Sequence, residues 1–421
     1  MTNHDREFDI VVFGATGFSG AANARYLAAH APTDVSIALA GRSLQKLQKI
    51  RSSLPSRAAQ WPLIVADVDT PSTLDAMAAR TKVIVTSVGP WLRYGENLLA
   101  AAVNAGCHYL DLTAEVPFVR WSIDKYHEQA VANGSRIIHS AGFDSIPSDL
   151  PVYLLYKAAA QDNQGTLTDT TMVLRKIVGW VSGGSVDTGR VYAEQAFKKG
   201  FLRMMLDPDS LTDSPDRPAR PRTRQPRDIR IVRGASVDPS LKGTLAPFIA
   251  SFYNARVVRR TNALLDGAYG PEFRYSEALS VTQRPIVSTV AAGVITAGYA
   301  IGLGAFALPP VRRLIDFALP KPGSGPGETI TDNGSLTVET YTRTTTGARY
   351  VARLQADCDP GYVMTSIMIG ECALALVRDE DRLPPAAGVL TTVAAFGDVL
   401  VERLNESDLI HLECERLDAR K

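Results

Sequence analysis

The chain has 421 residues, of which 45% are hydrophobic and 21% charged, which is typical of a globular protein of two or three domains. Its 45 basic and 44 acidic residues give a net charge of +1, which excludes a global field that attracts nucleic acid, and we expect no nucleic-acid partner. The four cysteines form no Cys-x-x-Cys pair and no Cys/His cluster, which argues for a reducing compartment and against a structural zinc. The polar N-terminus leads directly into a predicted strand, so we expect no signal peptide and a cytoplasmic protein.

The first 140 residues alternate short apolar runs with helix-like segments. The apolar runs predict six strands, at Phe8–Phe13, Val35–Ala40, Leu63–Ala66, Val83–Ser87, Tyr109–Leu112 and Arg136–His139. The segments between them predict five helices, at Gly17–His30, Ser43–Leu54, Ser72–Ala79, Gly95–Ala105 and Pro117–Asn133. Such alternation builds a parallel sheet with helices on both faces, and six strands fit two mononucleotide-binding halves. We therefore predict the α/β class, with a doubly wound Rossmann sheet over residues 1–150.

The alternation stops after Asp149, and the second half predicts an α+β domain. Leu336–Thr342 and Arg343–Gln355 predict the two arms of a β-hairpin, and Tyr362–Val377 and Ala386–Leu404 predict helices.

We interpret residues 151–385 as a domain that supplies a substrate lid or a dimer surface, which makes a homodimer one of the expected assemblies. Residues 386–421 are predicted to be a C-terminal helical segment that packs back on the Rossmann domain.

A glycine motif, Gly14-Ala-Thr-Gly17-Phe-Ser-Gly20, lies between the first predicted strand and the first predicted helix. In a dinucleotide-binding turn the first glycine permits the tight turn, the second lets the backbone approach the pyrophosphate, and the third allows close helix–strand packing. The phosphates then meet the unpaired amides at the helix N-terminus. The motif predicts cofactor contacts from Gly14, Gly17 and Gly20, and from Thr16 and Phe18 between them.

The end of the second strand indicates which dinucleotide binds. Asp or Glu there favours NAD, and Arg accommodates a 2′-phosphate; here Arg42 and Ser43 follow the strand without an acid. We predict NADP(H), with Arg42 pairing the phosphate and Ser43 acting as N-cap and hydrogen-bond donor. In the alternative interpretation, Arg42 covers the edge of the sheet and does not contact a cofactor. Asp67 closes the third strand, where it contacts the adenine or caps the next helix.

These motifs, together with three loop sequences, resemble the saccharopine dehydrogenase-like oxidoreductases. The loop sequences are Ser-Val-Gly-Pro-Trp-Leu-Arg-Tyr-Gly (87–95), Asp-Leu-Thr-Ala-Glu (111–115) and Gly-Phe-Asp-Ser-Ile-Pro-Ser-Asp (142–149). Two further runs, at 180–185 and 339–350, are similar to one branch, the mycobacterial trans-acting enoyl reductases of lipid synthesis. The resemblance implies NADPH-dependent reduction of a carbon–carbon double bond in an acyl chain. That chain would be a small-molecule thioester or would be carried by an acyl carrier domain of a polyketide synthase.

Two other functions remain open at this point. The first is a carbon–nitrogen oxidoreductase of the saccharopine type, whose polyanionic substrate would need several convergent Arg or Lys side chains. The second is a non-catalytic, membrane-associated protein that uses an NADP-binding domain as a scaffold, because a fold alone does not establish catalysis.

Candidate catalytic groups lie on the three loops expected beyond the carboxyl ends of the strands. Ser87 and Gly89 are predicted to pass close to the cofactor, since glycine permits a close approach. Reduction of an enoyl thioester needs a proton donor and donors for the enolate oxygen. We name Tyr94 first for this role, then Asp144 and Ser145. Each has a structural alternative, Tyr94 as a core or rim aromatic and the other two as turn residues.

An Arg- and Pro-rich stretch at 207–233 predicts an exposed loop. Because acyl carrier domains are acidic, its arginines are a candidate docking site for such a domain. The alternative is a solvated, disordered loop, which this composition commonly marks.

An apolar run at 285–308 contains no charged residue and is long enough to cross a bilayer as a helix. Three interpretations are open: a buried core helix, a segment lying in the membrane surface, and a true span. A span would separate the two domains that build one active site, so we predict peripheral contact with the inner face of the plasma membrane.

Overall fold

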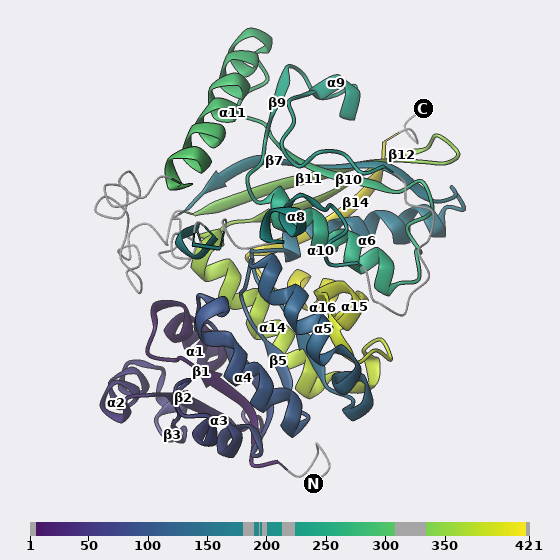
Figure 1. Cartoon of the computed structure of the whole chain (residues 1–421). Helices are drawn as coiled ribbons and strands as arrows, with labels where there is room; N and C mark the ends of the chain where they lie inside the picture. Colours follow the sequence, from purple (N-terminus) through teal and green to yellow (C-terminus); the bar gives the residue numbers. More distant parts are fainter. Residues whose placement is uncertain are drawn as a thin grey trace.

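The computed structural model describes residues 6–179, 189–192, 194–195, 200–212, 224–307 and 334–417. The strands form two sheets, one above the other in Figure 1, and helices lie between and around the sheets. Three of the arginines predicted for carrier docking, Arg217, Arg220 and Arg222, lie outside the described residues. So do the whole run at 180–185 and the end of the apolar run at Leu308.

The first sheet is the predicted Rossmann sheet, with seven parallel strands in the order β13-β6-β5-β4-β1-β2-β3. The first six are β1 (Phe8–Phe13), β2 (Ile37–Gly41), β3 (Leu63–Val65), β4 (Thr81–Thr86), β5 (His108–Leu110) and β6 (Arg136–Ile138). Their order is that of the two mononucleotide-binding halves, and it reverses between β1 and β4. The predicted fold class is therefore confirmed.

Helices cover both faces of this sheet because its strands are apolar on both sides. Ile10 and Val12 of β1 pack into one core cluster, and Val11 and Phe13 pack into another. The five predicted helices are present as α1 (Phe18–His30), α2 (Leu44–Ser53), α3 (Pro71–Ala78), α4 (Trp91–Ala105) and α5 (Val116–Asn133). The cluster around Ile10 also includes side chains of α14 (Thr365–Arg378), so a helix from the far end of the chain completes one face.

The second sheet is mixed and has the order β14-β12-β11-β7-β10-β9-β8. The predicted hairpin is confirmed as β11 (Ser335–Thr344) and β12 (Arg349–Ala356), paired antiparallel. The other strands are β7 (Leu167–Val178), β8 (Val232–Arg233), β9 (Thr244–Pro247), β10 (Arg274–Leu279) and β14 (Ile410–Arg416). Two helices, α6 (Ile146–Gln161) and α10 (Ser251–Leu264), pack together, and α6 also contacts β7, β11, β12 and β14.

The predicted helix over Ala386–Leu404 is wrong in its first part. Residues Gly388–Leu390 form β13, which pairs parallel with β6 and extends the Rossmann sheet. Two short helices follow, α15 (Thr392–Phe396) and α16 (Asp398–Asn405), before β14 pairs with β12. Residues 386–421 are therefore not only helical. Their two strands, β13 and β14, pair with the backbone groups that β6 and β12 would otherwise leave unpaired at the sheet edges.

Candidate active site

The glycine turn after β1 has the geometry that a dinucleotide requires. Gly14 has φ +80°, and a Cβ at this position would lie 2.3 Å from Val88 Cγ2. A Cβ at Gly20 would lie 2.2 Å from the Gly14 carbonyl oxygen, so this glycine allows α1 to pack against the turn. A Cβ at Gly17 would meet only the Gly14 carbonyl oxygen, at 3.4 Å. The outer side of Gly17 is therefore open to a bound group.

The N-terminus of α1 begins directly at this turn. Gly17 is its N-cap. The first amides of a helix have no intrahelical partner, and here no side chain caps them. Such amides and the positive end of the helix dipole suit a pyrophosphate. The exposed ring of Phe18 meets Tyr362 edge-on, with 4.5 Å between the ring centroids. Tyr362 lies in a short helical turn at Pro360–Met364 that leads into α14, so the C-terminal part of the chain borders the nucleotide site.

Arg42 and Ser43 follow β2 at the adenosine side of this site. Ser43 Oγ accepts a hydrogen bond from the Lys46 backbone amide at 3.4 Å, so the predicted N-cap is confirmed. Arg42 is exposed and forms no ion pair with a residue that the structure describes. Asp67 Oδ1 accepts a bond from the Asp69 amide at 3.1 Å, which shows it closing the turn before α3. A contact between Asp67 and the adenine stays a prediction. Thr16 Oγ1 lies beside the end of β2, since a Cβ at Gly41 would be 3.9 Å away.

The loop after β4 is fixed to the loop after β5 by a buried carboxylate. Glu115 Oε1 and Oε2 accept hydrogen bonds from the backbone amides of Trp91 (3.1 Å) and Leu92 (2.7 Å), at the first turn of α4. Gly89 is tightly enclosed by the Trp91 ring, because a Cβ there would lie 2.7 Å from it. Ser87 and Gly89 are both half-buried. Sequence analysis did not anticipate the capping role of Glu115.

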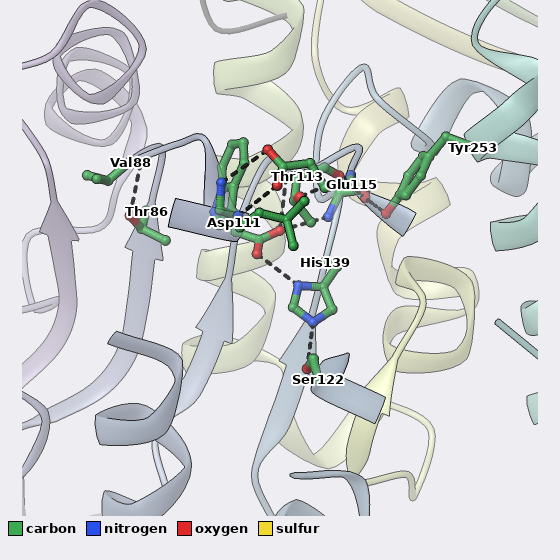
Figure 2. Close-up of polar contacts among 11 residues, drawn as sticks. Thr86, Val88, Asp111, Thr113, Glu115, Ser122, His139 and Tyr253 are labelled. Atoms are coloured by element: carbon green, nitrogen blue, oxygen red, sulfur yellow. Dashed lines mark hydrogen bonds and ion pairs between the residues drawn. The ribbon is translucent and has the colours of Figure 1, made fainter. Parts of the chain in front are cut away.

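A second buried network lies at the ends of β5 and β6 (Figure 2). Asp111 Oδ2 is 2.8 Å from His139 Nδ1, and His139 Nε2 is 2.9 Å from Ser122 Oγ. The other oxygen, Asp111 Oδ1, accepts bonds from the backbone amides of Thr113 and Ser140, each at 3.1 Å. Asp111 therefore holds two loops together as a strand-end cap.

The network continues into α10 of the second half. The Ser140 hydroxyl donates to the Thr113 carbonyl and lies within hydrogen-bond distance of the Tyr253 hydroxyl. Tyr253 is buried, and burial together with the negative charges of Asp111 and Asp144 raises the pKa of its hydroxyl well above its usual value. Tyr253 was missed by sequence analysis because α10 is far from the Rossmann motifs along the chain.

Asp144 lies in the loop after β6, beside this network, and is half-buried. Burial and the nearby negative charge of Asp111 raise the pKa of its carboxyl to about 7. A carboxylic acid with such a pKa is in part protonated at neutral pH, which suits a general acid. Its neighbour Ser145 is buried at the start of α6, with Oγ 3.5 Å from Asn254 Oδ1.

Tyr94 lies on the outer side of α4 and is 41% exposed. The structure therefore places it at the rim, while Asp144 and Ser145 lie with Tyr253 between the two halves. A catalytic role for each of the three predicted residues stays a prediction.

Three arginines on α10 point into the interior but are already engaged. Arg256 pairs with Asp228 at 3.0 Å and bonds to the Met205 carbonyl. Arg259 donates to the Tyr275 carbonyl, and Arg260 to the Leu211 carbonyl. Among the described residues, these guanidinium groups hold the fold together, and they leave no convergent cationic cluster for a polyanionic substrate.

A known family of dinucleotide-binding domains is similar to the N-terminal part of this chain. The model of the saccharopine dehydrogenase NADP-binding domain matches residues 10–138. The chain is 49% identical over 409 residues to Rv2449c of Mycobacterium tuberculosis, which is provisionally named a trans-acting enoyl reductase; the match covers 96% of this chain and 97% of the relative. It is 44% identical over 416 residues to the trans-acting enoyl reductase of Mycobacterium ulcerans, covering 97% and 98%.

The chain therefore belongs to the family of the trans-acting enoyl reductases, within the saccharopine dehydrogenase-like proteins. It is an NADP-binding oxidoreductase similar to the trans-acting enoyl reductases. Apo saccharopine dehydrogenase (L-Glu forming) from Saccharomyces cerevisiae shares its fold, with a TM-score of 0.52 and 13% identity over 97% of this chain and 99% of that one. At this identity the similarity extends to the fold alone. The family assignment implies an NAD(P) cofactor, and the glycine turn and the uncapped α1 fit one.

Proposed function

We propose that the protein is an NADPH-dependent enoyl reductase acting on an α,β-unsaturated acyl thioester, carried by a polyketide synthase carrier domain in lipid synthesis. The observation that carries the proposal is the half-buried Asp144, with a pKa near 7, in a full-length relative of the trans-acting enoyl reductases. The saccharopine-type alternative is less well supported, because the buried arginines of α10 are bonded to the protein itself.

The reaction adds a hydride to the β-carbon and a proton to the α-carbon, and the reduced nicotinamide supplies the hydride when it is bound. We assign proton delivery to Asp144. Its carboxyl loses the proton to the α-carbon and regains one from water. Asp111 supports this role as a positioning residue, because its negative charge favours the protonated form of Asp144. Tyr253 and Ser140 form a hydroxyl pair at the same junction, and we infer that Tyr253 orients the thioester.

The test compares Asp144→Asn with the wild type in NADPH oxidation driven by an enoyl-pantetheine thioester. We expect turnover to fall by about 10²-fold or more, the usual contribution of a general acid, with unchanged cofactor affinity. In the wild type, turnover should decline as the pH rises through about 7, because the proton donor is then lost; the variant should lack this decline. Because saccharopine is oxidised and cannot accept a hydride, it is tested with NADP⁺ in place of NADPH, and it should support no turnover.

The matched control is Asp149→Asn. Asp149 is five residues away, its pKa is also raised to about 7 by burial, and it is fully buried with a bond from Thr261. This variant should keep the pH-dependent decline. Equal losses in both variants would exclude Asp144 as the specific proton donor. Reduction of NADP⁺ by saccharopine, without oxidation of NADPH by the thioester, would contradict the proposed reaction. Tyr94→Phe in the same assay tests the residue named first from the sequence.

We infer a preference for NADPH from Arg42, which is exposed and forms no ion pair within the described part of the chain. A single charge-assisted contact with the 2′-phosphate is worth roughly 1.5–3 kcal/mol, or at least about tenfold in affinity. Arg42→Ala should therefore weaken NADPH binding about tenfold and leave NADH binding unchanged, as measured by fluorescence titration. Lys46→Ala, one turn further along on α2, is the control and should change neither affinity. An equal loss for both cofactors would show that Arg42 does not recognise the phosphate.

A further inference from the structure

The helix α11 (Pro285–Ala307) stands at one corner of the molecule, beside the edge of the second sheet (Figure 1). It packs by one side against β9, where Ser288 Oγ accepts a bond from the Thr244 amide at 2.9 Å. Its length is about 34 Å at 1.5 Å per residue. The predicted apolar run is therefore a helix, and it is not enclosed as a core helix would be.

The outward side of α11 is aliphatic. Five large apolar side chains are exposed on it, at Ile286, Val287, Val290, Val294 and Ile301. At 100° per residue they fall within an arc of about 100°, so they form one continuous stripe. Exposed Ile249 and Val281 lie on the segments next to the helix. An exposed apolar surface of this extent marks a contact with a partner or a membrane.

The serine and threonine hydroxyls of the helix lie outside the aliphatic stripe and bond to the helix backbone. The hydroxyls of Ser288 and Thr289 both donate to the Pro285 carbonyl, and Thr296 donates to the Ala292 carbonyl. The outward stripe therefore offers no polar side chain for hydrogen bonding. Protein–protein interfaces carry about one hydrogen bond per 100–200 Å², whereas the acyl region of a bilayer requires none.

The charges around the helix are positive. Residues 229–252 and 280–302 contain four basic residues and a single acid, Asp238. Asp238 is buried and paired with Arg349 at 2.9 Å. Exposed Lys242 and Arg284 lie at the N-terminal end of α11, and neither forms an ion pair with a residue in the described ranges. Cations beside an apolar helix face favour an anionic lipid surface.

We propose that α11 is a membrane-surface anchor, with its aliphatic stripe in the outer acyl region of an anionic bilayer and Lys242 and Arg284 at the headgroups. The helix lies in the plane of the membrane and does not cross it, because its opposite side is bonded to β9. The anchor holds the enzyme at the surface where long acyl chains reside. This inference does not depend on the proposed reaction.

The experiment is flotation of the full-length protein with vesicles of phosphatidylglycerol and phosphatidylethanolamine, and with neutral phosphatidylcholine vesicles. The wild type should float with the anionic vesicles, and less so at high salt. Val290→Glu combined with Val294→Glu should reduce binding at least tenfold. Lys242→Glu combined with Arg284→Glu should remove the preference for anionic lipid.

The matched control combines Val65→Glu with Val131→Glu, two valines that are about as exposed but lie on the Rossmann domain. This variant should bind vesicles like the wild type, and circular dichroism and cofactor binding confirm that each variant is folded. A folded wild type that does not float, or an α11 variant that floats equally well, would overturn the proposal. A dimer that the α11 variant abolishes, without vesicle binding, would assign the stripe to a second copy of the chain instead.

Discussion

Two apolar helices of this protein, α14 and α11, have opposite surroundings. The helical stretch Pro360–Arg378 is apolar and long enough to cross a membrane by length and composition, yet it is 83% buried in the protein. Every residue from Thr365 to Leu376 is buried, against α1, β4 and β5 of the Rossmann sheet. In contrast, α11 contacts β9 with one side and exposes its aliphatic residues on the other. Apolar composition alone therefore does not determine which helix belongs to the core.

The difference comes from what the rest of the chain offers. The Rossmann sheet has apolar residues on both faces, and the face lined by Ile10 and Val12 needs a helix beside α1, where α14 packs. The face of the second sheet that carries Arg175, Glu339 and Arg353 has only a small apolar cluster and also forms ion pairs, with Arg175 and Glu339 at 3.2 Å. Such a face does not need an apolar helix to cover it, and α11 sits beside β9 at the sheet edge.

The largest effect that this comparison predicts is a charge placed inside α14. Met368 is fully buried in the core, so Met368→Asp buries an unpaired carboxylate and should lower the free energy of unfolding by roughly 4 kcal/mol or more. Urea denaturation measures it. A loss below about 1 kcal/mol would mean that α14 is not a core helix.

A smaller loss is expected from the ion pair that fixes α14 to α16. Arg403 bonds Glu371 at 2.7 Å and Asp379 at 2.6 Å, and Glu371 is buried in the otherwise apolar helix. Among the described residues, Arg403→Met leaves the Glu371 carboxylate with the Tyr26 hydroxyl as its one side-chain partner, which should destabilise the protein by about 2–3 kcal/mol. The control is Arg382→Met, which removes exposed ion pairs with Asp379 and Glu402 and should cost far less, because solvent screens them. Similar losses from both would show that the Glu371 pair is no more than a surface contact.

The smallest effect on stability is predicted for α11. Val294 is 66% exposed, so Val294→Asp should change the free energy of unfolding by no more than about 0.5 kcal/mol. The same substitution should weaken vesicle binding. A destabilisation comparable with that of Met368→Asp would mean that the outer side of α11 is covered in solution, and the contrast between the two helices would fail.

The Rossmann domain was largely predictable from the sequence, since its signals are local. Strand–helix alternation and the spacing of Gly14, Gly17 and Gly20 depend on neighbouring residues, and Ser43 caps its own helix. By contrast, β13 was missed because three residues carry little periodicity, and only the exposed edge of β6 makes them a strand. The candidate site was found in part, because Asp144 lies on a Rossmann loop whereas Tyr253 comes from a distant helix.

By itself the sequence determined the α/β class, the dinucleotide-binding turn and the family, because short-range patterns and motif spacing carry that information. The tertiary structure alone decided which polar groups act together. It placed the Tyr253 hydroxyl beside Ser140 and bonded the Glu115 carboxylate to the first amides of α4. It raised the pKa of Asp144, first by burial and then by bringing Asp111 near it. It also decided that α14 is enclosed while α11 is exposed. Burial and electrostatic environment depend on residues that are remote in sequence, and these become neighbours only when the chain is folded.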